Sequence, residues 1–267
     1  EYVDAAFGNG TFVATADGGG VPGNKVMTSP DGLTWSAQAS ADDAKSWWRI
    51  AFGQNQFVAV SDGGVGNRVM TSPNGVIWTG QAAAAALAWR GICYSPDLNI
   101  FCAVAQTGVG NRVMTSVDGV TWTSQTSAAD ISWNDVIWAN GLFVAVAATA
   151  VGGAGDPDRV MTSPNGVSWT LRTGASPRTW QRVRYASSLF VAVANDGIAA
   201  NQVMTSPDGF AWTSRTAAAA LAWQGLAFAN GLFVAVAGSG VGNRVMTSPD
   251  GLSWTIGITP ADNNWFG

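Results

Sequence analysis

Short apolar stretches alternate with clusters of turn-forming residues along the whole chain. In one representative segment the stretches are WWRIAF (47–52), FVAVS (57–61), RVMTS (68–72) and IWTGQ (77–81). Between them stand GQNQ, DGGVGN and PNG, whose Gly, Asn, Asp and Pro residues favour turns over helix. Because the stretches are short and rich in Val, Phe, Trp and Thr, they predict four β-strands in the segment.

The same pattern recurs six times at intervals of about 44 residues. Each copy is anchored by an aromatic residue before the FVAV-like stretch, namely Phe7, Phe52, Tyr94, Trp138, Tyr185 and Phe228. A period in the forties is typical of four-stranded propeller blades and of some two-helix solenoids. No copy carries an amphipathic helical run, and the Ala-rich segments 81–88 and 216–222 are expected to be connecting loops.

The strand types favour blades over a solenoid. FVAV is apolar on both faces, as in a strand packed between neighbouring sheets, whereas WTSRT (212–216) alternates like a half-exposed outer strand. We therefore predict an all-β fold, a six-bladed β-propeller with four antiparallel strands per blade. It is expected to form one domain, residues 1–267, with repeats that start near residues 2, 47, 89, 133, 180 and 223.

The tail NNWFG places Trp265 where a seventh repeat would begin. Two interpretations stay open. The tail closes over the first blade as a clasp, or the chain is part of a longer repeat array.

The composition favours a folded protein without catalytic function. The chain has 47% hydrophobic and 11% charged residues, so it can bury a sizeable core. A net charge of −4 without a Lys/Arg cluster disfavours nucleic acid as a partner, and no apolar run approaches the ~20 residues needed for membrane insertion. Histidine is absent and Glu1 is the only glutamate, which removes imidazole metal sites and Ser-His-Asp triads. No metal, cofactor or catalytic residue is predicted.

A peptide shared by the repeats carries a family resemblance. SPDGLTW (29–35), SVDGVTW (116–122) and SPDGLSW (248–254) resemble the Asp-box, or BNR repeat, of sialidase-like propellers, with one residue missing between Asp and Gly. The resemblance implies structural turns away from an active site, and the family's catalytic residues have no counterpart here. Asp or Asn before Gly also favours a tight hairpin by its own chemistry. The residues expected in these turns are Ser29, Asp31, Trp35, Asp118, Trp122, Asp208, Trp212, Asp250 and Trp254.

A ligand-binding surface is expected where the loops between second and third strands meet the connections between blades. These segments repeat a Trp before the first strand and an Asn-Arg pair before the third, a combination that suits sugars through stacking and hydrogen bonding. The alternative is structural, with Trp packed between blades, Asn capping turns and Arg solvated. The candidates are Trp47, Asn67 and Arg68; Trp89, Asn111 and Arg112; Trp133, Asp158 and Arg159; Trp180, Asn201 and Gln202; Trp223, Asn243 and Arg244; and Tyr2 or Trp265 with Asn24 and Lys25.

Two further features differ between repeats. The fourth repeat has the longest of these loops, 148–158, followed by Arg178, Arg182 and Arg184, which could form an anion site around Arg182 or ordinary surface charge. If Tyr94 and Phe101 are hairpin partners, Cys93 and Cys102 face each other with Cα atoms roughly 4.5–5.5 Å apart. They are expected to form either a disulfide or a pair of reduced, buried thiols.

These features favour a non-enzymatic binding or display module. The expected setting is extracellular, as a secreted, cell-surface or virion protein with lectin-like recognition of a glycan or receptor surface. The alternative is a structural component of a virion, tail or surface filament with protein partners, and the repeat array is compatible with oligomers. A sialidase-like glycan hydrolase is the third interpretation.

Overall fold

The computed structural model describes residues 1–267 apart from 19–23, 65, 151, 154, 197–199 and 266–267. Its strands form six antiparallel sheets, each made of four consecutive strands. These sheets are the blades of a six-bladed all-β propeller, so the predicted fold class is confirmed. No helix among the described residues is long and apolar enough to cross a membrane.

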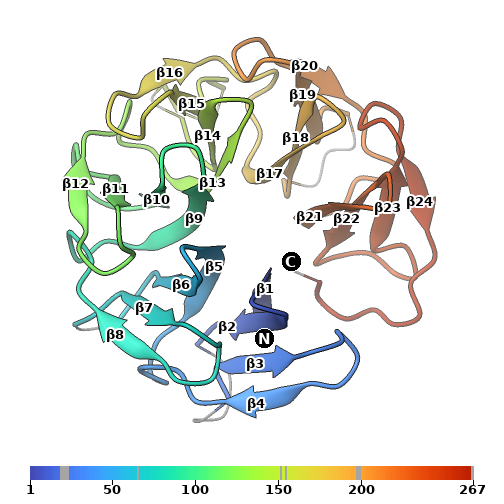
Figure 1. The fold of residues 1–267 in the computed structure, drawn as a ribbon. Helices are drawn as coiled ribbons and strands as arrows, with labels where there is room; N and C mark the ends of the chain where they lie inside the picture. Colours follow the sequence, from blue (N-terminus) through green and yellow to red (C-terminus); the bar gives the residue numbers. More distant parts are fainter. Residues whose placement is uncertain (19–23, 65, 151, 154, 197–199, 266–267) are drawn as a thin grey trace. The chain divides into compact units, whose positions relative to one another are not determined.

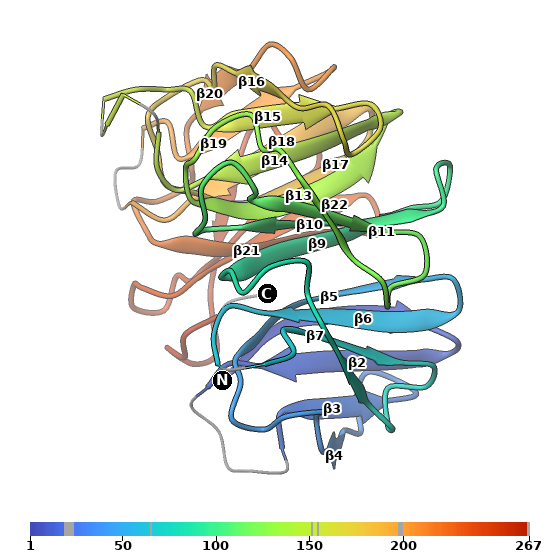
Figure 2. The ribbon, with the colours of Figure 1, turned by 90° about the vertical axis from the view of Figure 1, so that its left-hand side faces the viewer.

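The chain divides into two compact units, and the first comprises Glu1–Asp130 with Asn165–Ser168. In Figure 2 its first two sheets, drawn in blue and cyan, lie face to face. Blade 1 contains β1 (Tyr2–Gly8), β2 (Thr11–Ala16), β3 (Val26–Ser29) and β4 (Ser36–Gln38). Blade 2 contains β5 (Trp47–Gly53), β6 (Gln56–Ser61), β7 (Val69–Ser72) and β8 (Thr79–Gln81). Blade 3 contains β9 (Trp89–Ser95), β10 (Ile100–Ala105), β11 (Val113–Ser116) and β12 (Thr123–Gln125).

The second unit comprises Ile131–Pro164 and Trp169–Gly267. Blade 4 contains β13 (Trp133–Ala139), β14 (Leu142–Ala147), β15 (Val160–Ser163) and β16 (Thr170–Arg172). Blade 5 contains β17 (Trp180–Ala186), β18 (Leu189–Ala194), β19 (Val203–Ser206) and β20 (Thr213–Arg215). Blade 6 contains β21 (Trp223–Ala229), β22 (Leu232–Ala237), β23 (Val245–Ser248) and β24 (Thr255–Gly257). The first strands start at the predicted repeat starts, and the expectation of a single domain stays a prediction.

Within each unit the first strands of successive blades are neighbours, and the three-residue fourth strands lie farthest from them (Figure 1). The strand pairing repeats from blade to blade. In blade 1, Phe7 of β1 stands opposite Phe12 of β2, with ring centroids 4.5 Å apart. The tight turn between them places Asn9 and Gly10 at φ 49° and 74°, the left-handed conformation that Asn-Gly hairpins adopt readily.

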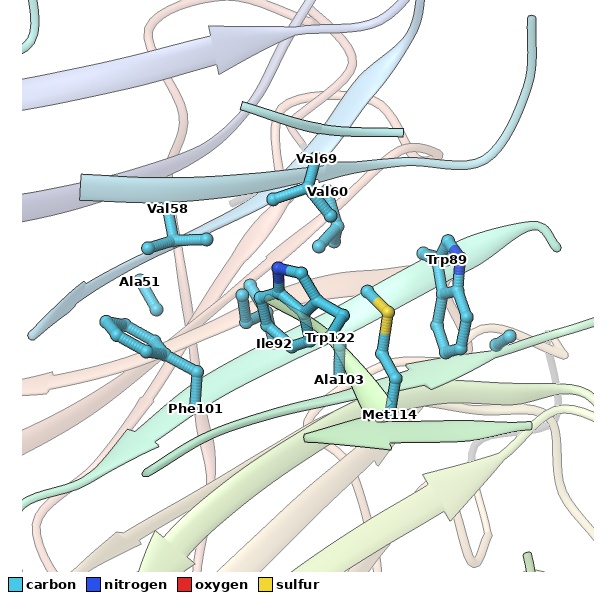
Figure 3. Packing of buried hydrophobic residues seen from close by; sticks show 11 residues of the cluster. Ala51, Val58, Val60, Val69, Trp89, Ile92, Phe101, Ala103, Met114 and Trp122 are labelled. Atoms are coloured by element: carbon cyan, nitrogen blue, oxygen red, sulfur yellow. The ribbon is translucent and has the colours of Figure 1, made fainter. Parts of the chain in front are cut away.

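Within each unit the hydrophobic core lies between successive sheets, as the doubly apolar FVAV stretches predicted. Between blades 2 and 3, Val58 and Val60 of β6 face the side of blade 3 that carries Phe101 and Ala103 of β10 (Figure 3). Trp89 and Met114 belong to the same cluster and are fully buried. Apolar side chains on both faces of the second strand therefore join each blade to its neighbours within a unit.

Candidate functional site

The Asp-Gly and Asn-Gly peptides form the turns between third and fourth strands. In blade 3 the Ser116 hydroxyl donates to Asp118 Oδ1 at 2.9 Å, and the same oxygen accepts the backbone N–H groups of Val120 and Thr121 at 2.8 and 2.7 Å. These backbone donors, aided by Ser116, lower the pKa of Asp118 to about 2. Trp122 Nε1 closes the turn by donating to the Gly119 carbonyl at 3.0 Å.

Blades 1, 5 and 6 repeat this network, and in blade 2 an asparagine replaces the aspartate. The turn residues involved are Ser29, Asp31 and Trp35; Ser72, Asn74 and Trp78; Ser206, Asp208 and Trp212; and Ser248, Asp250 and Trp254. The carboxylate and hydroxyl oxygens thus serve the turn itself.

The turns also pack against the preceding blade, which the sequence did not indicate. A Cβ added to Gly75 of blade 2 would lie 2.5 Å from Val13 Cγ2 of blade 1. A Cβ added to the corresponding glycine of three other turns would also contact a valine of the preceding blade. These pairs are Gly119 with Val58, Gly209 with Val144, and Gly251 with Val191. Each of these glycines has a positive φ between 71° and 80° and allows close approach of two blades.

The tryptophans that begin the first strands are core residues. Trp47, Trp89, Trp133, Trp180 and Trp223 are all 0% exposed. This burial corrects the expectation that they offer stacking faces, because a ring without exposed surface has no face for a sugar. Tyr2, their counterpart in blade 1, is 39% exposed, and its hydroxyl donates to the Asn24 carbonyl.

The basic or amide side chains before the third strands hold the connections to the next blade. Arg68 Nη1 donates to the Leu87 carbonyl at 2.6 Å, and Gln202 Nε2 donates to the Leu221 carbonyl at 2.6 Å. Arg244 Nη1 likewise donates to the Asn263 carbonyl at 2.7 Å. Arg68 therefore contacts the segment leading to Trp89, and Gln202 contacts the segment leading to Trp223, whereas the sequence pattern grouped each of them with the Trp of its own repeat.

The other members of this position make related contacts. Arg112 donates to the carbonyls of Gln106 and Gly108, and the buried Lys25 ammonium donates to the Asp17 carbonyl at 2.7 Å. The structural interpretation expected solvated basic side chains at this position, whereas Arg112 and Lys25 both bind backbone carbonyls. The amides beside them differ in exposure: Asn24 and Asn67 are exposed, whereas Asn111, Asn201 and Asn243 are half-buried.

The C-terminal tail follows the same pattern as a connection between blades. Asp262 Oδ1 accepts the Gly242 N–H, as Asp130 Oδ1 accepts the Gly110 N–H. The Trp265 N–H then donates to the Ala237 carbonyl at 3.4 Å, within blade 6 of the same unit. Up to Trp265 the tail is thus held by its own blade.

The three arginines after the blade 4 loop do not form an anion site. Arg182 is 0% exposed, Arg184 Nη1 donates to the carboxylate of Asp135 at 2.9 Å, and Arg178 Nη1 lies 3.5 Å from Asp196 Oδ2. Arg182 is inaccessible and the other two guanidinium groups face carboxylates, so the prediction of an anion site around Arg182 is wrong.

A stacked ion pair on the first unit was not predicted from the sequence. The Arg90 guanidinium lies 3.7 Å above the Trp48 ring, and Arg90 Nη2 is 3.0 Å from Asp62 Oδ2. Burial lowers the pKa of Arg90, and the Asp62 carboxylate opposes this shift. The other five repeats have no Arg at the Arg90 position, so the pair is specific to these two blades.

The second unit contains a recess of about 410 Å³ beside the loop that joins β14 to β15. Its walls are Ala148, Thr149, Ala150 and Gly153 from the loop, Thr179 from the connection to blade 5, and Arg159. The loop is the longest of the six, as the sequence indicated, and its residues 151 and 154 lie outside the described part. The extra length was the available signal for this recess, whereas nothing in the sequence identified Thr149 or Thr179.

Side-chain and backbone contacts brace this loop. Asp156 accepts the Gly152 N–H at Oδ2 (2.7 Å) and the Asp158 N–H at Oδ1 (2.9 Å), and these bonds lower its pKa. The Pro157 carbonyl accepts the N–H groups of Arg159 and Gly174, both at 2.8 Å. The recess therefore stands between two braced segments of one unit.

Cys93 and Cys102 stand directly opposite each other on β9 and β10, beside the pair Tyr94 and Phe101, as predicted. The two cysteines are not joined by a disulfide in the structure. Cys102 is fully buried, and this burial raises the pKa of its thiol.

Among the residues with described positions, no group of three or more Cys, Asp or Glu side chains is arranged to hold a metal ion. No protein-family model matches the chain, and no curated protein matches it.

The fold is similar to several solved structures. YCF48 bound to D1 peptide is 14% identical with a TM-score of 0.71, over 100% of this chain and 85% of that one. Virginiamycin B lyase from Staphylococcus aureus is 8% identical with a TM-score of 0.79, over 97% and 85% of the two chains. The GH74 enzyme of Niastella koreensis is 21% identical with a TM-score of 0.64, over 95% of this chain and 36% of that chain. At these identities the similarity shows a common fold that serves both binding and catalysis.

Proposed function

We propose that the chain is a non-enzymatic binding module that holds a protein partner on the loops between its second and third strands. The observation that carries the proposal is that the residues shared by all blades in and beside these loops differ in their contacts from the residues that only blade 4 has. The shared Trp side chains are buried, and the Arg and Gln side chains before the third strands bind the protein's own backbone, whereas blade 4 adds a braced loop and a recess of about 410 Å³. A rigid scaffold with one differentiated loop is typical of recognition proteins.

A protein partner is favoured over a glycan because burial of the tryptophans removes the stacking faces that sugar recognition would use. The solved complex of YCF48, a protein of similar fold, with a peptide supports the same choice. The Asp-box relationship and an extracellular or surface-displayed setting belong to this proposal as well. Immunodetection in culture medium, on intact cells and in lysate of the source would test the setting.

The binding proposal is tested by probing a random peptide array and a glycan array with the labelled full chain. We expect reproducible peptide signals that Thr179→Trp abolishes by filling the recess. Ala222→Trp is the matched control, since Ala222 takes the place of Thr179 before the first strand of blade 6. Signals on glycans alone, or peptide signals that both variants retain, would contradict the proposal.

A further inference from the structure

The recess at blade 4 has an arginine in its wall whose hydrogen bonds go to the protein's own backbone. Arg159 is 4% exposed, and its Nε donates to the Asp156 carbonyl at 3.1 Å. Its Nη1 donates to the carbonyl oxygens of Ala148 and Arg178. These three bonds fix the guanidinium group as part of the wall.

The charges around this wall are balanced. The carboxylates of Asp196 and Asp156 both act on Arg159, and Asp196 also pairs with Arg178 at 3.5 Å. Two cationic side chains therefore stand among two carboxylates. The charge of Arg159 is therefore partly compensated by carboxylates of the protein itself, so an anionic ligand group that gives up its hydration would gain less from this arginine.

The remaining lining is small and rich in methyl groups. Ala148 and Ala150 contribute methyl groups, and Gly153 leaves the wall without a side chain. Thr149 and Thr179 also line the recess, and the Thr149 hydroxyl already accepts the Ser132 N–H at 2.8 Å. A volume of about 410 Å³ lies within the range of small-ligand pockets and is large enough for one apolar side chain.

From these contacts we infer that the recess takes a single aliphatic or aromatic side chain of the bound partner and disfavours an acidic one. This inference rests on the proposed function and names the chemistry that the partner presents there. It reverses the sequence-based expectation of an anion site in this part of the chain.

The test uses N-acetyl amides of leucine, phenylalanine and aspartate as probes, with binding to the full chain followed by ligand-observed NMR. We expect saturable binding of the leucine or phenylalanine amide, about tenfold tighter than that of the aspartate amide. Thr179→Trp should abolish this binding and Ala222→Trp should preserve it. Ala150→Phe fills the same recess from the loop and serves if Thr179→Trp does not fold, as judged by its melting curve.

Equal or tighter binding of the aspartate amide, or apolar binding that both filling variants retain, would overturn the inference. The two proposals fail separately. Peptide-array binders without a preference for an apolar residue would overturn the inference and leave the proposed function standing. Binding of the apolar amides without any peptide binder would support the recess chemistry and contradict the proposed function.

Discussion

The contact between a turn and the preceding blade can be measured with a pair of matched glycine substitutions. Gly75 and Gly10 have nearly the same left-handed backbone, with φ 76° and 74°. A Cβ on Gly75 would lie 2.5 Å from Val13 Cγ2 and 3.2 Å from Thr28 Cγ2, whereas a Cβ on Gly10 meets nothing within 4 Å. Both substitutions therefore place an alanine in the left-handed conformation, which costs free energy. Only Gly75→Ala also creates a steric clash between two blades.

The shared backbone cost is about 1–2 kcal/mol in the free energy of unfolding. Overpacking against Val13, which is fully buried and cannot easily move aside, adds about 1–3 kcal/mol to Gly75→Ala alone. The melting temperature should fall by roughly 2–4 °C for each kcal/mol in a chain of this size. Urea denaturation and calorimetry of both variants measure the difference.

A double-mutant cycle with Val13→Ala checks the cause. Removing the Val13 methyl groups should relieve the shortest contact and leave that with Thr28 at 3.2 Å, so that Gly75→Ala in this background destabilises the chain less than it does in the original chain. Equal losses for Gly75→Ala and Gly10→Ala in the original chain would refute the reasoning, because the turn would then carry no packing between blades.

Three further predictions concern other contacts. The pKa of Asp118, about 2, lies below that of an unfolded aspartate, so the unfolded chain takes up protons first and stability falls as the pH drops from ~4 to ~2. Asp118→Asn should weaken this pH dependence of the urea midpoint, and an unchanged dependence would contradict the prediction. The buried Cys102 thiol should resist alkylation in the folded chain, and both cysteine thiols should react after unfolding without reductant. If mass spectrometry finds alkylated thiols only after reduction, the two cysteines form a disulfide instead. Asp262→Ala should speed hydrogen exchange at Gly242 while leaving Gly110 protected by Asp130, and equal protection at Gly242 would count against the tail contact.

The sequence predicted the blades well because each blade is specified locally. Alternating turn residues and apolar stretches mark the strands, and the two-residue spacing of side chains sets the pairing of Tyr94 with Phe101 and Cys93 with Cys102. Burial on both faces of FVAV followed from its composition. These features depend on residues close together in the chain.

The ligand side was predicted less well because its contacts join residues to backbone carbonyls. Every residue has a backbone carbonyl, so the sequence did not show that the Leu87 carbonyl accepts a hydrogen bond from Arg68. Arg68 was therefore predicted to bind a ligand. The exposed or buried state of Trp47 likewise depends on packing between blades, which an aromatic residue before a strand does not reveal. Only the extra length of the blade 4 loop indicated the recess.

The direction of the turn contacts has a consequence for how such a chain changes over evolutionary time. Blades 2 and 5 each contain both halves of one interface, since the Gly turn (Gly75 or Gly209) fits the blade before it and the valine (Val58 or Val191) receives the turn of the blade after it. A tandem duplication of one whole repeat therefore creates a junction identical to the existing ones, whereas a deletion inside a repeat damages two junctions. Because stability is then shared between nearest neighbours, gain and loss of entire repeats is tolerated better than small insertions within the strands. The VMTS peptide, which is identical in all six repeats, fits a chain that grew by copying complete units.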